Sequence, residues 1–318
     1  MRIPAANRKK GKSHRVLFIF IAVLFLVFIG VGIIAFGSSL NSGRQWRTNI
    51  VFNTSPPVLL SYPVNKEDKI LLFILPENLS LQVPYGYGTY EIESLWGLAR
   101  LENRPMLVRD SFTDLFGIPV SGMIGATRTH PVSLNPDHLT TELSQVIKLG
   151  ESDSYMKLTE QLRYALDLRF LVTKRLLQYD LRSQPLYETV TLPGEAEAVL
   201  VNPNKWDSFL AQKFEEVKIR EEALTVTIKN TTSVSGIGQK FARFVASIGG
   251  KILRVGNEES DINKCQLRLA EVNRTKLLVR FLMEEFGCTI SDRLETDEEE
   301  VVVIIGQSFA SRWAKSID

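Results

Sequence analysis

Three arginines and two aspartates lie close together in the sequence and are of the types that bind phosphate. Arg100, Arg104 and Arg109 are followed by Asp110 and Asp114. Guanidinium groups bind phosphate oxygens in a bidentate manner, and carboxylates hold the Mg²⁺ ion that accompanies a polyphosphate. The solvated face of a helix carries the same residue types, and isolated surface charges say little about function. A basic ligand-binding patch and an ordinary helix surface therefore both remain open.

Four aromatic side chains gather around a glycine-rich turn just before these arginines. The turn contributes Tyr85 and Tyr87, and Tyr90 and Trp96 follow. Aromatic rings on a loop can stack on sugar rings, whereas a cluster of this kind more often covers a small hydrophobic core. We favour the core, and keep the four aromatic residues and the three arginines as candidate ligand-binding residues.

The sequence offers little for metal or redox chemistry. Its histidines, His14, His130 and His138, are scattered and show none of the Cys/His spacings of zinc sites. Cys265 and Cys288 both lie near the C-terminus, either as a disulfide or as two free core thiols. We therefore predict no metal and no cofactor.

An apolar stretch near the N-terminus decides on which side of a membrane we expect all of these residues to lie. It begins at Val16, ends at Phe36 and contains no charged residue. A helix of its 21 residues matches the ~30 Å hydrocarbon thickness of a bilayer. Six Lys and Arg residues and no acidic residue precede it, which predicts a cytoplasmic N-terminus and an extracytoplasmic bulk. A cleaved signal peptide is the alternative, although its apolar region would be shorter.

The rest of the chain is long enough for two domains with their own cores. The formal net charge of +2 comes mostly from the basic tail, so the remainder is near neutral and gives no electrostatic argument for nucleic acid. We divide the chain into a basic cytoplasmic tail at 1–15, a transmembrane helix at 16–36, a linker at 37–57, an α/β (α+β) domain at 58–200, a connecting helix at 201–222, a C-terminal domain at 223–310 and a tail at 311–318.

Hydrophobic periodicity outlines the elements of the middle domain. Short apolar or alternating runs predict strands, and apolar residues at helical spacing predict helices. A glycine just past one helix, Gly117, marks its end. The predicted elements are strands at 69–75, 79–83 and 187–192 and helices at 90–101, 106–116 and 154–179.

The C-terminal domain shows a repeated strand–helix–strand order. The predicted elements are strands at 224–229, 251–255, 265–269, 288–290 and 301–305, with helices at 237–248 and 277–286. Two successive units of this kind predict a β-α-β-β-α-β ferredoxin-like sandwich with both helices on one face of the sheet. Cys265 and Cys288 would then begin neighbouring parallel strands ~5 Å apart, which a disulfide can span.

Residues 223–310 resemble the C-terminal domain of the LytR/CpsA/Psr cell-envelope proteins. The features that match are Asn230-Thr231-Thr232 after the first strand, Ser235-Gly236-Ile237 opening the helix, and the late strand VVVIIG followed by Phe309. Thr231 stands where the family commonly has glycine.

Residues 69–125 resemble a degenerate copy of the main domain of the same family. The matching steps are Leu75-Pro76-Glu77-Asn78, Val83-Pro84-Tyr85-Gly86 and Gly117-Ile118-Pro119-Val120. The family's enzymes transfer a lipid-pyrophosphate-linked glycopolymer to peptidoglycan and need Arg and Asp residues for the pyrophosphate and Mg²⁺. This chain has Glu77-Asn78 at the Arg-Asp step, which puts a carboxylate where a phosphate would bind. We therefore assign no catalytic residue.

The resemblance and the departure together predict a membrane-anchored, extracytoplasmic protein of the bacterial cell envelope. We predict that it is non-catalytic and binds cell-wall glycan, a glycolipid or an envelope assembly partner. Its expected contacts are the bilayer, through residues 16–36, and peptidoglycan, lipid-linked glycan or envelope proteins, but not nucleic acid. The alternative is a divergent glycopolymer phosphotransferase that uses the arginines and aspartates at 100–114.

Overall fold

The computed structural model describes residues 45–65, 67–125, 132–134, 138, 142–143, 146, 175–260, 262–292 and 301–312. The predicted membrane helix from Val16 to Phe36 and the basic tail before it lie outside these residues. Within the described ranges, each helix is too short or too polar to cross a bilayer. All the elements below belong to one unit of the chain, Gln45–Asp318.

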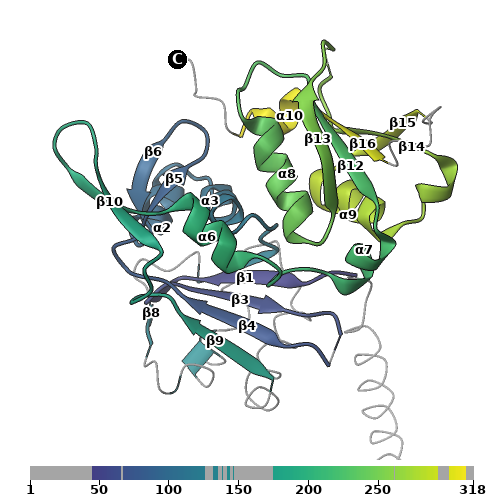
Figure 1. Ribbon diagram of the computed structural model, residues 1–318. Coiled ribbons are helices and arrows are strands. Elements are labelled where there is room, and N and C mark those ends of the chain that lie inside the picture. The colour runs from purple at the N-terminus through teal and green to yellow at the C-terminus, as the bar shows by residue number, and fades with distance from the viewer. Residues whose placement is uncertain are drawn as a thin grey trace, which may run out of the picture. The chain divides into compact units, whose positions relative to one another are not determined.

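A five-stranded mixed sheet organises the N-terminal half of this unit, which we call the N-terminal lobe (Figure 1). Its inner strands are buried at every position, because both faces of the sheet are covered. Alternate side chains of one strand enter different cores: Leu71 and Phe73 face one, and Ile70, Leu72 and Ile74 the other. In spatial order the strands are β7 (Gly122–Ile124), β1 (Thr48–Phe52), β3 (Val58–Tyr62), β4 (Ile70–Ile74) and β9 (Leu176–Asp180).

Two of these strands correct the sequence prediction. Strand β1 lies within the stretch 37–57 that was predicted as a linker, yet it is fully buried between β3 and β7. Strand β9 lies at the end of the helix predicted over 154–179 and pairs in parallel with β4. The rest of that predicted helix, up to residue 174, is outside the described residues. In both strands, pairing with distant partners decides the conformation, and local periodicity does not contain that information.

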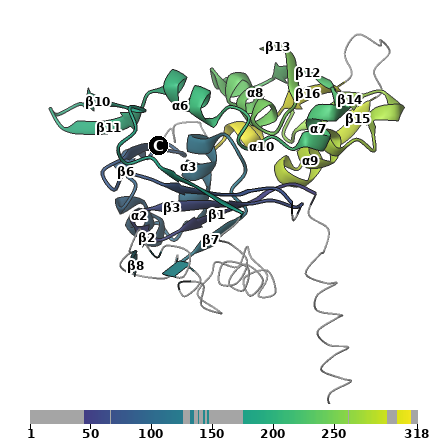
Figure 2. The same ribbon diagram turned by 60° about the horizontal axis from the view of Figure 1, so that its bottom comes forward.

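Helices and a hairpin cover one face of this sheet. Helix α3 (Met106–Phe116) has the predicted bounds and ends at Gly117, whose φ of 64° is left-handed. Helix α2 (Ser94–Leu101) begins later than predicted, because residues from 88 onward pair as β6 (Gly88–Glu91) with β5 (Ser80–Val83). On the covered face, the Phe73 ring lies 5.4 Å, centroid to centroid, from that of Phe116 in α3. Figure 2 shows α3 lying over this side of the sheet.

The predicted connecting helix at 201–222 is two helices, α6 (Pro203–Leu210) and α7 (Val217–Glu222). The side chain of Asn202 caps α6 by accepting a hydrogen bond from the Lys205 amide at 3.2 Å. The chain leaves helical geometry after Leu210 and buries Phe214 against the N-terminal core. Shorter elements are β2 (Thr54–Ser55) with β8 (Val132–Ser133), and the ribbon of β10 (Tyr187–Thr191) with β11 (Glu197–Val201). The strand predicted at 187–192 therefore pairs outside the main sheet.

The second five-stranded sheet forms the C-terminal lobe, with α8 (Ile237–Ser247) and α9 (Leu277–Phe286) packed on one face (Figure 1). In spatial order its strands are β13 (Lys251–Asn257), β12 (Thr225–Asn230), β16 (Val301–Ile305), β14 (Gln266–Leu269) and β15 (Thr289–Asp292). The turn η2 (Glu271–Asn273) and helix α10 (Gln307–Ala310) complete the lobe.

This strand order corrects the ferredoxin-like prediction. Each strand–helix–strand unit joins neighbouring parallel strands, β12 with β13 and β14 with β15, instead of strands separated by a third. Strand β16 lies between the two units, parallel to β12 and antiparallel to β14. Its five apolar residues are all buried, so a central position is the one that suits them.

Cys265 and Cys288 form a disulfide within this sheet. They precede β14 and β15, which pair in parallel with Gln266 opposite Thr289, and their Cα atoms are 4.4 Å apart. Both cysteines are buried. The bond therefore joins the starts of two neighbouring strands, as the sequence suggested.

Candidate functional site

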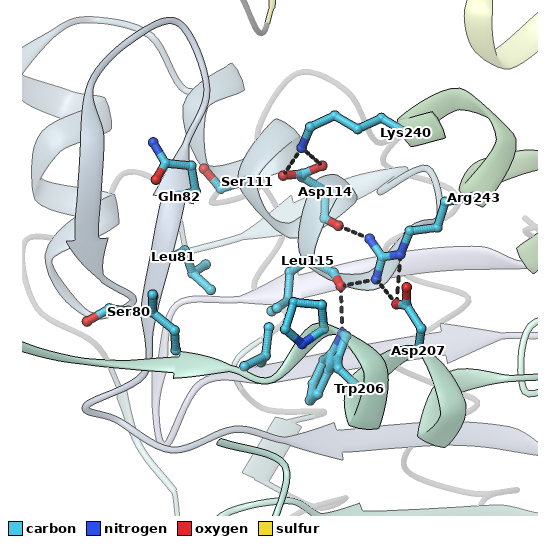
Figure 3. A pocket seen from close by; sticks show the side chains of 13 residues that line it. Ser80, Leu81, Gln82, Ser111, Asp114, Leu115, Trp206, Asp207, Lys240 and Arg243 are labelled. Atoms are coloured by element: carbon cyan, nitrogen blue, oxygen red, sulfur yellow. Dashed lines mark hydrogen bonds and ion pairs between the residues drawn. The ribbon is translucent and has the colours of Figure 1, made fainter. Parts of the chain in front are cut away.

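The candidate site is a pocket of about 320 Å³ where the two lobes meet (Figure 3). Its volume lies at the lower end of the range of small-molecule sites. Four segments supply the walls: strand β5, helix α3, the junction of β11 with α6, and helix α8. The lining residues are Ser80, Leu81, Gln82, Ser111, Asp114, Leu115, Leu200, Val201, Pro203, Trp206, Asp207, Lys240 and Arg243.

The end of helix α3 forms the centre of the pocket. The last carbonyl groups of a helix lack partners within the helix and carry its partial negative charge. The guanidinium group of Arg243, from α8, donates hydrogen bonds to the carbonyl oxygens of Asp114 and Leu115, the latter at 2.8 Å. The indole Nε1 of Trp206 also donates to the Leu115 carbonyl, at 2.6 Å. Side chains from two other helices therefore cap α3.

A glycine makes this approach possible. A Cβ atom on Gly117 would lie only 3.1 Å from Cζ of Arg243, and the residue also has a positive φ. Glycine tolerates both the left-handed backbone and the close contact. The same residue therefore ends α3 and gives the arginine access to its final carbonyl groups.

Two ion pairs balance the charge of the pocket. Nζ of Lys240 contacts both carboxylate oxygens of Asp114, at 2.7 and 2.8 Å. Nε of Arg243 donates to Oδ1 of Asp207 at 2.8 Å. The lining thus has two cationic and two anionic side chains, and each cation is paired with one carboxylate. Such a surface presents donors and acceptors without a net field, so it suits a neutral polar ligand better than a polyanion.

The other walls are apolar with a polar margin. Leu81, Leu115, Leu200 and Val201 supply apolar surface. Ser80 and Ser111 are buried hydroxyl residues, and Gln82 is exposed at the margin. The hydroxyl of Ser111 donates to the Leu107 carbonyl at 2.7 Å, so its oxygen can still accept a hydrogen bond from a ligand. Apolar walls with a few convergent polar groups are typical of a small-molecule site.

A second hollow of about 810 Å³ adjoins the same charged residues. Asp207, Lys240 and Arg243 line both hollows. The remaining walls of the second hollow come from the end of α6, the segment after it, the exposed side of α8, Phe116 and Ile252.

The aromatic residues singled out in the sequence lie away from this pocket lining and pack on the N-terminal core. Trp96 is 5% exposed, and Tyr85, Tyr87 and Tyr90 are partly buried against the same core. The hydroxyl of Tyr85 donates to Oδ2 of Asp110 at 2.7 Å. Burial and then this hydrogen bond raise the pKa of Tyr85 to about 12. The cluster therefore has the position expected for a cover of the core.

The arginines singled out in the sequence are placed differently from one another. Both Nε and Nη2 of Arg109 donate to Oδ1 of Asp110, at 2.9 and 2.8 Å. Cζ of Arg104 lies 5.9 Å from the centre of the Tyr85 ring, and Arg100 is exposed in the last turn of α2. Asp110 is 2% exposed and accepts from Tyr85 and Arg109, so its carboxylate has a structural role in this arrangement. Within the described part of the chain, no three His, Cys, Asp or Glu side chains are grouped as metal ligands.

Two carboxylates lie close together beside Ser55, those of Glu77 and Glu93. Oε1 of Glu77 accepts a hydrogen bond from the Ser55 hydroxyl at 2.6 Å, and Oε1 of Glu93 lies 3.2 Å from the same hydroxyl oxygen. Two carboxylates therefore share one hydroxyl at this point. A phosphate placed there would be repelled by both.

No family model and no curated protein matches the sequence. Among solved structures, the chain is similar to the crystal structure of TagV from B. subtilis, a LytR/CpsA/Psr protein, with a TM-score of 0.36, 6% identity, and coverage of 52% of this chain and 95% of that one. It is also similar to the crystal structure of a transcriptional regulator from Enterococcus faecalis, with a TM-score of 0.34, 8% identity, and coverage of 53% and 86%. Scores and identities of this size do not identify a family.

Most of the residues that line the pocket went unnoticed in the sequence. The sequence pattern singles out Asp114 together with the arginines, but Asp207, Lys240 and Arg243 have no distinguishing pattern around them. They are ordinary polar residues on helices, and Lys240 lies 126 positions from its partner Asp114. Only the contact between the lobes brings these charges together.

Proposed function

We propose that this chain is a non-catalytic binding protein of the bacterial cell envelope that holds a neutral glycan in the pocket where its lobes meet. In this proposal the segment from Val16 to Phe36 anchors the chain in the cell membrane, with the N-terminus in the cytoplasm and the lobes outside. The observation that carries the proposal is the charge balance of the pocket, in which both cations contact carboxylates.

The state of these charges supports binding over phosphoryl transfer. A transferase that acts on a lipid pyrophosphate needs cationic donors directed at the phosphate oxygens. Arg243 directs its donors to carbonyl oxygens and to Asp207, and Arg109 directs its donors to Asp110. Binding a pyrophosphate would require breaking these contacts and placing the ligand beside the freed carboxylates.

The composition of the pocket supports a saccharide as the ligand. Sugar rings have apolar C–H faces and hydroxyl groups that both donate and accept hydrogen bonds. Leucine and valine side chains suit the faces, and the paired charges and serine hydroxyls suit the hydroxyl groups. The extracytoplasmic location is supported by the disulfide between Cys265 and Cys288, because such bonds persist in oxidising compartments.

Sedimentation of the full chain, solubilised in detergent, with purified peptidoglycan tests this function. We expect the chain to co-sediment with peptidoglycan and to be released by soluble neutral glycan fragments. Binding should change little between low and moderate salt, because the pocket has no net charge. If the chain failed to sediment but released the lipid pyrophosphate carrier in the presence of Mg²⁺, the transferase alternative would replace this proposal.

A further inference from the structure

We infer that the two hollows form one continuous track for an extended neutral oligosaccharide, which crosses the ion pair between Arg243 and Asp207. This inference rests on the proposed function and specifies the length of its ligand. The first argument is adjacency: Asp207, Lys240 and Arg243 line both hollows, so the same three side chains form a common boundary. A linear ligand bound in the smaller hollow has its next unit beside the larger one.

Both hollows have the same chemistry. The larger one has apolar surface from Phe116, Leu210 and Ile252 and polar groups from glutamine residues at its margin. Its charged lining is again balanced, since Glu215 and Asp207 accompany Lys240 and Arg243. A repeating neutral polymer needs repeated sites of similar character, and these two provide them.

Small side chains along helix α8 give the second hollow its room. Ala242, Ala246 and Ser247 line it, and Ala246 is exposed. From Lys240 to Ser247 the helix rises by about 10 Å, at ~1.5 Å per residue. The track is therefore longer than a single small ligand requires.

The crossing point is held in place and still offers hydrogen bonds. Three acceptors fix the guanidinium group of Arg243: the carbonyl oxygens of Asp114 and Leu115 and Oδ1 of Asp207. Both contacts of Arg243 with Asp207 use Oδ1, and the Asp207 side chain is 50% exposed. Its Oδ2 can therefore accept a hydrogen bond from a ligand hydroxyl without loss of the ion pair. A rigid crossing lowers the entropy that is lost on binding.

Variants that fill one hollow at a time test the inference. Gln82→Trp obstructs the smaller hollow and Ala246→Trp the larger one, and both positions are exposed, so folding should be retained. Met283→Trp, at a partly exposed position on α9, is the matched control. The full chain in detergent is titrated with a neutral disaccharide and with a hexasaccharide of the same linkage, and binding is measured by calorimetry.

The hexasaccharide should bind at least about tenfold more tightly than the disaccharide. Gln82→Trp should weaken both ligands, whereas Ala246→Trp should remove the advantage of the hexasaccharide and leave the disaccharide unchanged. If Ala246→Trp left hexasaccharide affinity intact while Gln82→Trp abolished binding, the continuous track would be refuted and the proposed function would stand. If neither saccharide bound, both would fail. If Ala246→Trp instead separated a dimer of the chain, the larger hollow would be a contact between copies, and the track would be refuted.

Discussion

Replacing Arg243 with alanine should destabilise the unit Gln45–Asp318 by about 3 kcal/mol. The two hydrogen bonds to main-chain carbonyls at the end of α3 are charge-assisted and contribute about 1.5 kcal/mol each. The ion pair with the half-exposed Asp207 adds about 0.5 kcal/mol at most. Trp206 still donates to the Leu115 carbonyl in the variant, which limits the loss.

Urea unfolding of residues 45–318, followed by circular dichroism under oxidising conditions, measures this loss. Arg280→Ala is the control, because Arg280 is exposed on α9, and we expect its effect to stay within about 0.5 kcal/mol. Arg243→Lys keeps the charge but lacks the forked geometry, so it should recover about half of the loss. If Arg243→Ala were no more destabilising than Arg280→Ala, the capping role of Arg243 would be wrong.

A double-mutant cycle with Gly117 tests the contact itself. Gly117→Ala should cost more than about 1 kcal/mol, because alanine must adopt a left-handed backbone and its Cβ would press on Cζ of Arg243. In the Arg243→Ala background only the backbone strain remains, so the cost should fall. Equal costs in the two backgrounds would show that the arginine does not lie against this glycine.

Three further predictions concern the disulfide, a buried tyrosine and the shared carbonyl. Reduction of the disulfide should destabilise the unit by about 3 kcal/mol, which is the loop-entropy value for the 23-residue separation of Cys265 and Cys288. A variant with serine at both positions should show the same loss of stability and should not respond to reductant. Tyr85 should ionise near pH 12, followed by its absorbance at 295 nm, and Asp110→Asn should lower that pKa. Because the folded pKa is raised above the usual value of ~10, the stability that Tyr85 contributes is present below pH ~10 and lost as the pH rises through 12. Trp206→Phe should lower the free energy of unfolding by about 1 kcal/mol alone. It should lower it by more in the Arg243→Ala background, because the Leu115 carbonyl then loses both of its donors. If the two losses were simply additive, the two side chains would not share this acceptor.

Elements with strong local signals could be predicted from the sequence. Helix α3 was predicted with the bounds it has, since its apolar face and its C′ glycine, Gly117, are both local features. The five strands of the C-terminal lobe and its helices α8 and α9 were predicted to within one or two residues for the same reason, whereas η2 and α10 were not predicted. The order of the strands in the sheet was predicted wrongly, because the position of β16 depends on pairing with β12 and β14, which lie far away in sequence.

Strands that depend on distant partners were missed. Thr48–Phe52 has a short polar and apolar mixture that resembles a linker, yet its neighbours β3 and β7 bury every residue of it. The apolar residues of Leu176–Asp180 continue the helical spacing of the preceding segment, but the segment forms a strand that pairs in parallel with β4. A short segment of this composition can form a helix, a strand or a loop, and the strand available to pair with it decides which conformation it adopts.

The sequence by itself determined the parts of this protein that depend on residue type and local spacing: an apolar segment long enough for a bilayer, two alternating α/β regions and a cysteine pair. The tertiary structure decided the candidate site. Lys240 and Arg243 belong to a helix whose charges look like any solvated surface, and 126 or more residues separate them from their partners on α3. Whether such a charge faces water or a carboxylate is a property of the contact between lobes, and a one-dimensional pattern does not record it.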